Sequence, residues 1–541
     1  MARAKRSFRF RWFVAVLLAV ALPVTLFLMG GRPPPKASGK AGPEARLSTY
    51  TIADPTGDWG FPSPYGMYPR GPGYVRMSLV FDTLLWKDED GPTGALAEDW
   101  SHDESEGTYS FRLRPGLKWH DDRPLTADDV VFTFEYMREH PWPWSDLGAI
   151  DKVEALDEQT VRISLSRPYA PFPSNIAGAV PILPRHVWEG VEAPEEFREP
   201  EALIGSGPYE LADYDRTHGT YLYEAWDDYH LGRPLADTLR FVRYSQEMTP
   251  AALRGGRVNA GPVPAEALEN LEAGGFELET EPPVWAAKLM MNHRQAPLSD
   301  RRFRQAIAHA LDRERIVRIV RRGHGIPGSI GLIPPSNRFW HNPDVATYNH
   351  DEERARALLM EAGYAPGPDG TFRKDGNRLE LELAVSGERQ EMLRLAEMVA
   401  RQLRDAGIDV RTRGVEAKAL DSMLGEGRFD LALSGHGGLG GDPEILNKVI
   451  IGDLFTSAGY YENAEMVTLL KEQLRQTCER RRRRKVHRIQ ELYAYELPAI
   501  TLYHPKSYWG HDGKATLFHT PGGMAIGIPI PLNKLSFVER E

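Results

Sequence analysis

The sequence predicts an α/β fold in which a mainly parallel sheet is covered by helices. Three observations in the second half of the chain predict this class. Apolar residues alternate over 379–385, as in a half-buried strand, and apolar residues at helical spacing follow over 392–403. Gly407 ends that helix, Ile408 begins a return strand, and residues 429–433 form a further strand. Strand–helix–strand units with short turns place their strands in parallel.

The first half predicts strands and a capped helix. Apolar residues alternate over 109–113 before the tight turn at 114–116. Thr126 can accept from free N–H groups at the start of a helix while Asp129 reaches back to the Thr126 backbone, and apolar residues follow at helical spacing over 130–137.

Composition places the chain among ordinary globular proteins. It has 541 residues, of which 41% are hydrophobic and 26% charged, so we expect roughly three to four domain-sized units. The single cysteine, Cys478, excludes an internal disulfide and any dithiol, iron–sulfur or zinc site that needs paired cysteines. The sequence predicts no cofactor and no metal.

Charge is divided unevenly along the chain. Residues 1–46 carry nine Lys or Arg against one acid, so the remaining residues carry −18 of a chain whose total is −10. An acidic body of this size repels phosphate backbones, and we expect no nucleic-acid partner.

The basic N-terminus precedes an uncharged apolar run over residues 12–29. Residues 1–31 are therefore predicted to be a signal peptide or a membrane anchor, with the basic end cytoplasmic and the body exported. No small-x-small cleavage site follows directly and no cysteine there can take a lipid, which favours an uncleaved anchor. The Pro- and Gly-rich residues 32–46 are predicted to be a linker.

Ordered blocks along the chain resemble one family. The blocks at 79–86, 95–100, 109–122 (YSFRLRPGLKWHDD) and 125–130 (LTADDV) each match a segment of that family's sequence pattern. Further blocks in the same order lie at 204–209, 297–306, 310–313, 355–359 and 402–408. Together they resemble the family 5 extracellular solute-binding proteins, the substrate receptors of dipeptide, oligopeptide and nickel ABC importers.

The resemblance implies a two-lobed periplasmic-binding-protein-like fold with a hinge, an extra domain and a central ligand cleft. The predicted boundaries are 45–70, 201–284 and 506–541 for a discontinuous hinge lobe, 71–200 for the extra domain and 285–505 for the second lobe. The implied partners are a peptide or similar polar solute and ABC transporter permease subunits. Closure of the lobes around the solute would work by population shift.

The most unusual loop covers residues 434–443, after the strand at 429–433. It contains a formal GxGxxG match. A dinucleotide-binding motif also needs an Asp or Glu at the end of the next strand, and no clear strand of that kind follows at the required distance. We interpret it as a strand-end loop where missing side chains let backbone approach a ligand, with Gly441 as a candidate contact. The alternative is a plain turn in which Asp442 caps the next helix.

Two side chains of this loop are candidate ligand contacts. In peptide-binding relatives an acidic residue of this Asp-Pro loop receives the ligand's amino group, and Asp442 matches the carboxylate of the pair. Leu439, Gly440 and Gly441 precede it without a second acid, which departs from a standard amine clamp. His436 can bind a carboxylate when protonated or a metal chelate when neutral; otherwise it only donates hydrogen bonds.

Aromatic residues near the predicted cleft are the remaining candidates. Trp509, beside Tyr508, lies in the segment that crosses between lobes, and Tyr74 lies near the cleft edge of the first lobe by analogy. For both, the alternative is a place in the core. The run Arg480–Arg484 is predicted to form the solvated face of an amphipathic helix.

The sequence favours binding over catalysis. It contains no HExxH, GxSxG or Walker loop, and its histidines lack ligand spacing. We therefore predict an extracytoplasmic receptor that is not an enzyme. The alternatives are a membrane-tethered ligand sensor and an exported hydrolase, since two distant catalytic carboxylates leave no short motif.

Overall fold

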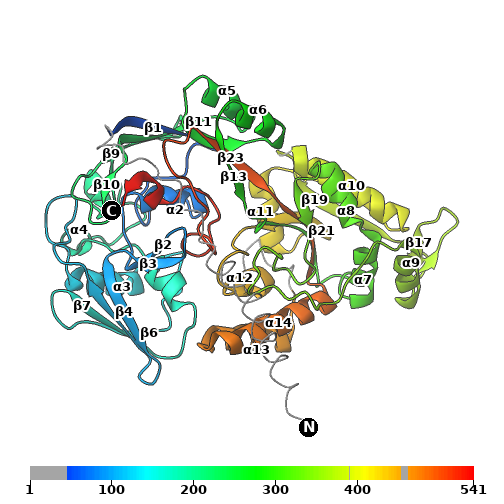
Figure 1. The fold of residues 1–541 in the computed structure, drawn as a ribbon. Coiled ribbons are helices and arrows are strands. Elements are labelled where there is room, and N and C mark those ends of the chain that lie inside the picture. Colours follow the sequence, from blue (N-terminus) through cyan, green and yellow to red (C-terminus); the bar gives the residue numbers. More distant parts are fainter. Residues whose placement is uncertain (1–45, 389, 453–460, 541) are drawn as a thin grey trace, which may run out of the picture. The chain divides into compact units, whose positions relative to one another are not determined.

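The computed structural model describes residues 46–388, 390–452 and 461–540 (Figure 1). The predicted signal or anchor at 1–31 and nearly all of the linker at 32–46 lie outside these residues. In the part that is described, no helix has both the length and the apolar character needed to cross a membrane. Residues 47–541 form one compact unit, so a chain that begins at Arg46 keeps every described core.

The first sheet has seven strands in the order β13-β23-β12-β1-β11-β9-β8. β1 pairs in parallel with β11 and β12, whereas β23 is antiparallel to β12 and β13. Its strands come from three separate parts of the chain, each inside a segment predicted for the hinge lobe; the boundaries themselves stay a prediction. The strands are β1 (Leu47–Asp54), β8 (Tyr209–Asp215), β9 (Thr220–Ala225), β11 (Ala236–Arg243), β12 (Ala260–Val263), β13 (Glu277–Glu281) and β23 (Ser507–His511).

The second sheet has six strands in the order β15-β22-β14-β21-β19-β20. β19 pairs in parallel with β20 and β21, and helices α10 and α11 make the two crossovers. β14 is antiparallel to both of its neighbours, so the sheet is mixed where the sequence predicts a mainly parallel one. The strands are β14 (Ala286–Met291), β15 (Gly325–Pro327), β19 (Glu380–Ser386), β20 (Asp409–Val415), β21 (Leu431–His436) and β22 (Ala499–Pro505).

The predicted extra domain contains a four-stranded antiparallel sheet, β4-β5-β7-β6. Its helix α3 begins as the sequence predicts, with the Asp129 carboxylate accepting from the Thr126 N–H at 2.9 Å. The strands are β4 (Ala97–Asp103), β5 (Thr108–Leu113), β6 (Ile150–Ala155) and β7 (Thr160–Leu165). Smaller pairings join β2 (Leu85–Lys87) to β3 (Pro92–Gly94), β10 (Arg233–Pro234) to β24 (Val538–Glu539), and β17 (Phe372–Lys374) to β16 (Ala365–Pro366) and β18 (Asn377–Arg378).

Apart from α3, the α-helices of the first sheet and the extra domain have eight residues or fewer. They are α2 (Gly71–Ser78), α3 (Ala127–Glu139), α4 (Arg185–Trp188), α5 (Thr249–Arg254) and α6 (Leu268–Ala273). Those of the second lobe are α7 (Arg301–Ala310), α8 (Arg313–Val320), α9 (Glu352–Glu361), α10 (Gln390–Asp405), α11 (Ala417–Glu426), α12 (Ile445–Ile451), α13 (Ala464–Arg475) and α14 (Glu479–Glu496).

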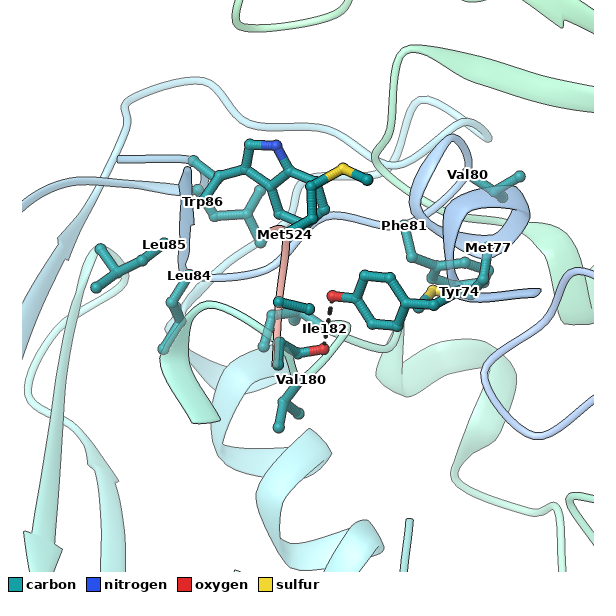
Figure 2. Close-up of a cluster of buried hydrophobic side chains, with 14 of the residues drawn as sticks. Tyr74, Met77, Val80, Phe81, Leu84, Leu85, Trp86, Val180, Ile182 and Met524 are labelled. Atoms are coloured by element: carbon teal, nitrogen blue, oxygen red, sulfur yellow. Dashed lines mark hydrogen bonds between the residues drawn. The ribbon is translucent and has the colours of Figure 1, made fainter. Parts of the chain in front are cut away.

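The extra domain and the first lobe share one hydrophobic core. It joins Phe241 and Phe537 of the lobe to Trp86 and Phe111 of the extra domain. Figure 2 shows part of this core, where Tyr74, Trp86 and Met524 lie among aliphatic side chains. The second lobe has separate clusters, and the buried members of each described cluster come from one side or the other. Leu474 of α13 is partly buried and packs against the core of the opposite side, but the fully buried members of each core stay on their own side when the lobes move apart.

One polar side chain is buried inside the second sheet. Lys288 on β14 lies opposite Ser434 on β21 and Thr501 on β22, and its side chain is fully buried. Burial disfavours the ammonium form and lowers the pKa of Lys288 to about 7 from an ordinary value of 10.5.

We expect Lys288→Met to change how stability depends on pH. Between pH 7 and pH 10 the unfolded wild-type chain keeps the Lys288 proton and the folded chain loses it. The free energy of unfolding of the wild type should therefore rise with pH, relative to the variant, by about 1.4 kcal/mol per unit. Urea denaturation at pH 7, 8 and 9 measures this rise. Lys471→Met, at an exposed position of α13, is the control for charge loss; a pH-independent difference between wild type and Lys288→Met would contradict the prediction.

Candidate functional site

Two short segments of the described chain pass between the two large sheets. Residues 282–285 lead from β13 to β14, and Lys506 alone separates β22 from β23. β13 and β23 pair with each other in the first sheet, so both crossings lie side by side (Figure 1). This arrangement is a two-stranded hinge, and the site is built on the loops around it.

A glycine-rich loop follows β21 at its carboxyl end. An added Cβ at Gly435 would lie 2.0 Å from the Trp285 ring, so only glycine fits under that indole. An added Cβ at Gly441 would lie 2.9 Å from the Cα of Gly527. Gly441, which the sequence predicts to approach a ligand, here approaches the backbone of the C-terminal segment instead.

The C-terminal segment presents a tight turn to this loop. Met524 and Ile528 exchange backbone hydrogen bonds at 2.9 and 2.8 Å across the turn. The Lys87 ammonium donates to the carbonyls of Gly523 at 3.1 Å and Ala525 at 3.0 Å, and burial lowers the pKa of Lys87 to about 8. The turn is therefore fixed to the extra domain, and it meets the second lobe backbone to backbone.

Asp442 is fully engaged within the protein. Its two carboxylate oxygens accept from the Arg482 guanidinium at 2.6 and 2.5 Å, and one of them also accepts from the Glu444 N–H at 2.8 Å. Arg482 is buried and donates from Nε to Gln473 at 3.0 Å. The prediction that all of Arg480–Arg484 forms a solvated face is therefore wrong at Arg482. Asp442 positions the loop.

His436 is buried at the end of β21. Its Nδ1 donates to the Gly437 carbonyl at 3.0 Å, and its Nε2 has no hydrogen-bond partner among the described residues. Burial, and then the nearby Lys288, hold the pKa of His436 well below its ordinary value. The ring is neutral at pH 7, which disfavours the interpretation of a protonated clamp for a carboxylate.

The hinge aromatics point in opposite directions, as neighbours on a strand must. Trp509 is 8% exposed and packs in the core of the first lobe, whereas the Tyr508 hydroxyl is 2.9 Å from His324 Nδ1 and its ring faces a pocket. Tyr74 is fully buried and donates its hydroxyl to the Ala179 carbonyl at 2.9 Å (Figure 2). The structure brings Asp442, His436 and Gly441 together and places Trp509 and Tyr74 in the core.

Glu444 joins the second lobe to the extra domain. The Tyr169 hydroxyl donates to one of its carboxylate oxygens at 2.6 Å, and the Asn175 amide donates to the other. The Ala170 N–H also donates to the Leu474 carbonyl at 2.7 Å. Sequence reasoning missed Glu444, because its partners lie some 270 residues away and no local spacing reveals them.

A pocket of about 480 Å³ lies at the hinge and takes residues from both lobes. We call it the hinge pocket. Its lining residues are Gln246, Glu247, Pro264, Ala265, Glu266, Glu281, Trp285, Val320, Arg321, Arg322, His324, Glu391, Arg394, Pro505, Lys506, Ser507 and Tyr508.

The hinge pocket carries both signs of charge. Arg321 pairs with Glu391 at 2.6 Å, and Arg322 of the second lobe pairs with Glu266 of the first. Arg394 and the ammonium of Lys506 have no ion-pair partner in the described part of the chain. Burial raises the pKa of Glu281 to about 7. Within that same part, no group of three or more His, Cys, Asp or Glu side chains could hold a metal ion.

Comparison with known proteins gives a consistent result. Residues 91–448 match the family model described as bacterial extracellular solute-binding proteins, family 5. The dipeptide-binding protein of Escherichia coli K12 is 30% identical over 422 residues, which cover 71% of this chain and 76% of that protein. The oligopeptide-binding protein AppA of Bacillus subtilis is 28% identical over 434 residues, which cover 76% and 78%.

Solved structures share the fold. The ABC transporter substrate-binding protein CtaP of Listeria monocytogenes superposes with a TM-score of 0.78 at 23% identity, covering 92% of this chain and all of that one. A periplasmic oligopeptide-binding protein of Thermotoga maritima gives 0.78 at 22% identity over the same shares. The predicted two-lobed α/β fold is confirmed.

We expect Asp442→Ala to lower the stability of the unliganded protein by about 3–5 kcal/mol. Removing the carboxylate leaves the buried Arg482 guanidinium without its charge partner. Urea denaturation at pH 7 measures the loss. The double variant Asp442→Ala/Arg482→Met should recover part of it, because neither charge then remains buried alone. Glu465→Ala, which breaks the exposed pair with Arg488, is the matched control and should change stability little. A small loss for Asp442→Ala would contradict the positioning role.

Proposed function

The chain belongs to the family 5 bacterial extracellular solute-binding proteins, and on that premise we propose that it captures peptides between its lobes for an ABC importer. A polar solute of similar size is the alternative cargo. The dipeptide- and oligopeptide-binding relatives support this choice, because they match most of the chain. We propose that the protein then delivers the bound solute to the permease subunits of that importer. The body acts outside the cytoplasm, as in the rest of the family.

The observation that carries the proposal is the hinge pocket, which both lobes line. A solute held there contacts both lobes only when they are close together, so binding favours the closed arrangement. The contacts of Glu444 with Tyr169 and Asn175 add to the same arrangement, since they too join opposite sides. This mechanism needs no covalent chemistry, and we propose that the protein is not an enzyme.

The charges of the hinge pocket suit a solute with an ammonium and a carboxylate. Glu281 and Glu247 can receive the ammonium group of a peptide, while Arg394 and Lys506 can receive its carboxylate. The pocket size suits a small ligand. In this proposal Asp442 does not contact the solute and instead fixes the loop that carries Glu444. His436 and Gly441 do not line the hinge pocket, and we propose no direct contact between them and the solute.

The first test is peptide binding by residues 46–541, measured by calorimetry and thermal shift. Di- to pentapeptides with free termini should raise the melting temperature, with about 2.7 kcal/mol of stabilisation at a ligand concentration 100 times Kd. N-acetylated peptides should bind at least tenfold more weakly, because the ammonium is lost. Affinity should rise roughly fivefold from pH 6 to pH 7 as Glu281 ionises, and Glu281→Gln should remove that rise. Equal binding of free and acetylated peptides would contradict the assignment, and no peptide binding would contradict the function.

A second test addresses closure. Glu444→Gln removes the charge that Tyr169 and Asn175 share while keeping the size of the side chain. We expect peptide affinity to fall about three- to tenfold, through faster dissociation, because hydrogen bonds to a charged group lose roughly 1 kcal/mol when it is neutralised. Stopped-flow dissociation measures this, and Tyr169→Phe should give a smaller change in the same direction. Glu465→Gln, on the exposed surface of α13, is the matched control. An unchanged dissociation rate in Glu444→Gln would show that this contact does not hold the lobes closed.

A further inference from the structure

Helix α14 begins with a stripe of three arginines and a histidine whose pKa is lowered by burial and by Arg483. Arg480, Arg483, Arg484 and His487 follow at helical spacing and therefore share one face of the helix. With Phe339 they line a cavity of about 370 Å³, which we call the arginine groove. The Arg483 guanidinium lies 5.1 Å from the centre of the Phe339 ring. The groove is separate from the hinge pocket and shares no residue with it.

The three arginines of the groove differ from their neighbours in their partners. Arg482 is neutralised by Asp442, and Lys485 by Glu472 at 2.6 Å. In the described part of the chain, Arg480, Arg483 and Arg484 have no ion pair with an acid. Glu479 lies in the first turn of the helix, and Asp344 and Glu491 act electrostatically on His487.

This placement opposes the stability of the free helix. The N-terminal end of a helix carries a partial positive charge, so cations in the first turns are repelled by it. Like charges three and four residues apart repel one another as well. An anion in the arginine groove would remove both repulsions.

We propose that the arginine groove binds the phosphate of an anionic phospholipid headgroup. Phe339 is 38% exposed at its wall, and an exposed aromatic ring beside a basic cluster is typical of surfaces that sit at headgroup level. The predicted anchor at residues 12–29 would keep the body near a membrane. Because the chain beyond residue 46 carries −18, an anionic membrane repels most of its surface. The groove is a local exception and would orient the body on the membrane.

The test compares vesicle binding by residues 46–541, which lack the apolar segment and keep the compact unit. Vesicles of phosphatidylglycerol and phosphatidylcholine in equal parts should sediment the protein at low salt, and phosphatidylcholine vesicles should not. The triple variant Arg480→Gln/Arg483→Gln/Arg484→Gln should bind roughly 100-fold more weakly, at about fivefold per arginine near an anionic surface. Its melting temperature without lipid should be equal or higher, because the repulsions are gone.

The controls separate lipid from other sources of negative charge. Arg254→Gln/Arg315→Gln/Arg318→Gln removes the same charge from exposed positions on α5 and α8 and should bind vesicles like the wild type. Inorganic phosphate at millimolar concentration should compete with the vesicles. Equal vesicle loss in both triple variants would overturn the proposal, as would binding of a polyglutamate peptide with no binding of anionic vesicles. Peptide affinity, measured in parallel, should be unchanged in both variants, so failure here is distinct from failure of the proposed peptide function.

Discussion

A buried ion pair between Asp442 and Arg482 fixes the part of the molecule on which the lobes meet. It joins the glycine-rich loop after β21 to helix α14, forty residues further along the chain. Glu444 lies two residues after Asp442, and its backbone N–H donates to the Asp442 carboxylate. Its own carboxylate then reaches Tyr169 and Asn175 of the extra domain. A short chain of charge-assisted bonds thus runs from the interior of the second lobe to the opposite side.

The described contacts between the lobes are mostly polar, whereas each side is held together by a large apolar core. The extra domain shares a continuous core with the first lobe, so these two parts move as one body. Across the hinge, the glycine loop touches the C-terminal turn through backbone, and single hydrogen bonds complete the contact. Such an interface can open at small cost, because the apolar surface that returns to water is limited to partly buried side chains such as Leu474. Reversible closure is what a receptor that must release its solute requires.

Several polar groups sit where they lower the stability of the protein. Lys288 is buried in the second sheet, Glu281 is shielded in the hinge pocket, and the arginines of α14 repel the end of their own helix. Each arrangement disfavours the charged form or the helix that carries it. Glu281 and the arginines of α14 line cavities in which a ligand of opposite charge would stabilise the charged form of these side chains.

The sequence by itself determined the strands near 109–113 and 379–385, the helix over 392–403, the helix start at Thr126 and Asp129, and the family. These features depend on residues close together in the chain, or on ordered blocks, and local spacing reveals both. Only the tertiary structure decided which aromatic of the hinge faces the pocket. Tyr508 and Trp509 are neighbouring aromatic residues whose side chains point to opposite faces of β23, and the sequence does not tell which face is the core. It also decided that Asp442 binds Arg482 and that Glu444 meets Tyr169. Those pairs join distant segments, and their formation depends on how the helices and loops pack around the sheets rather than on any pattern along the chain.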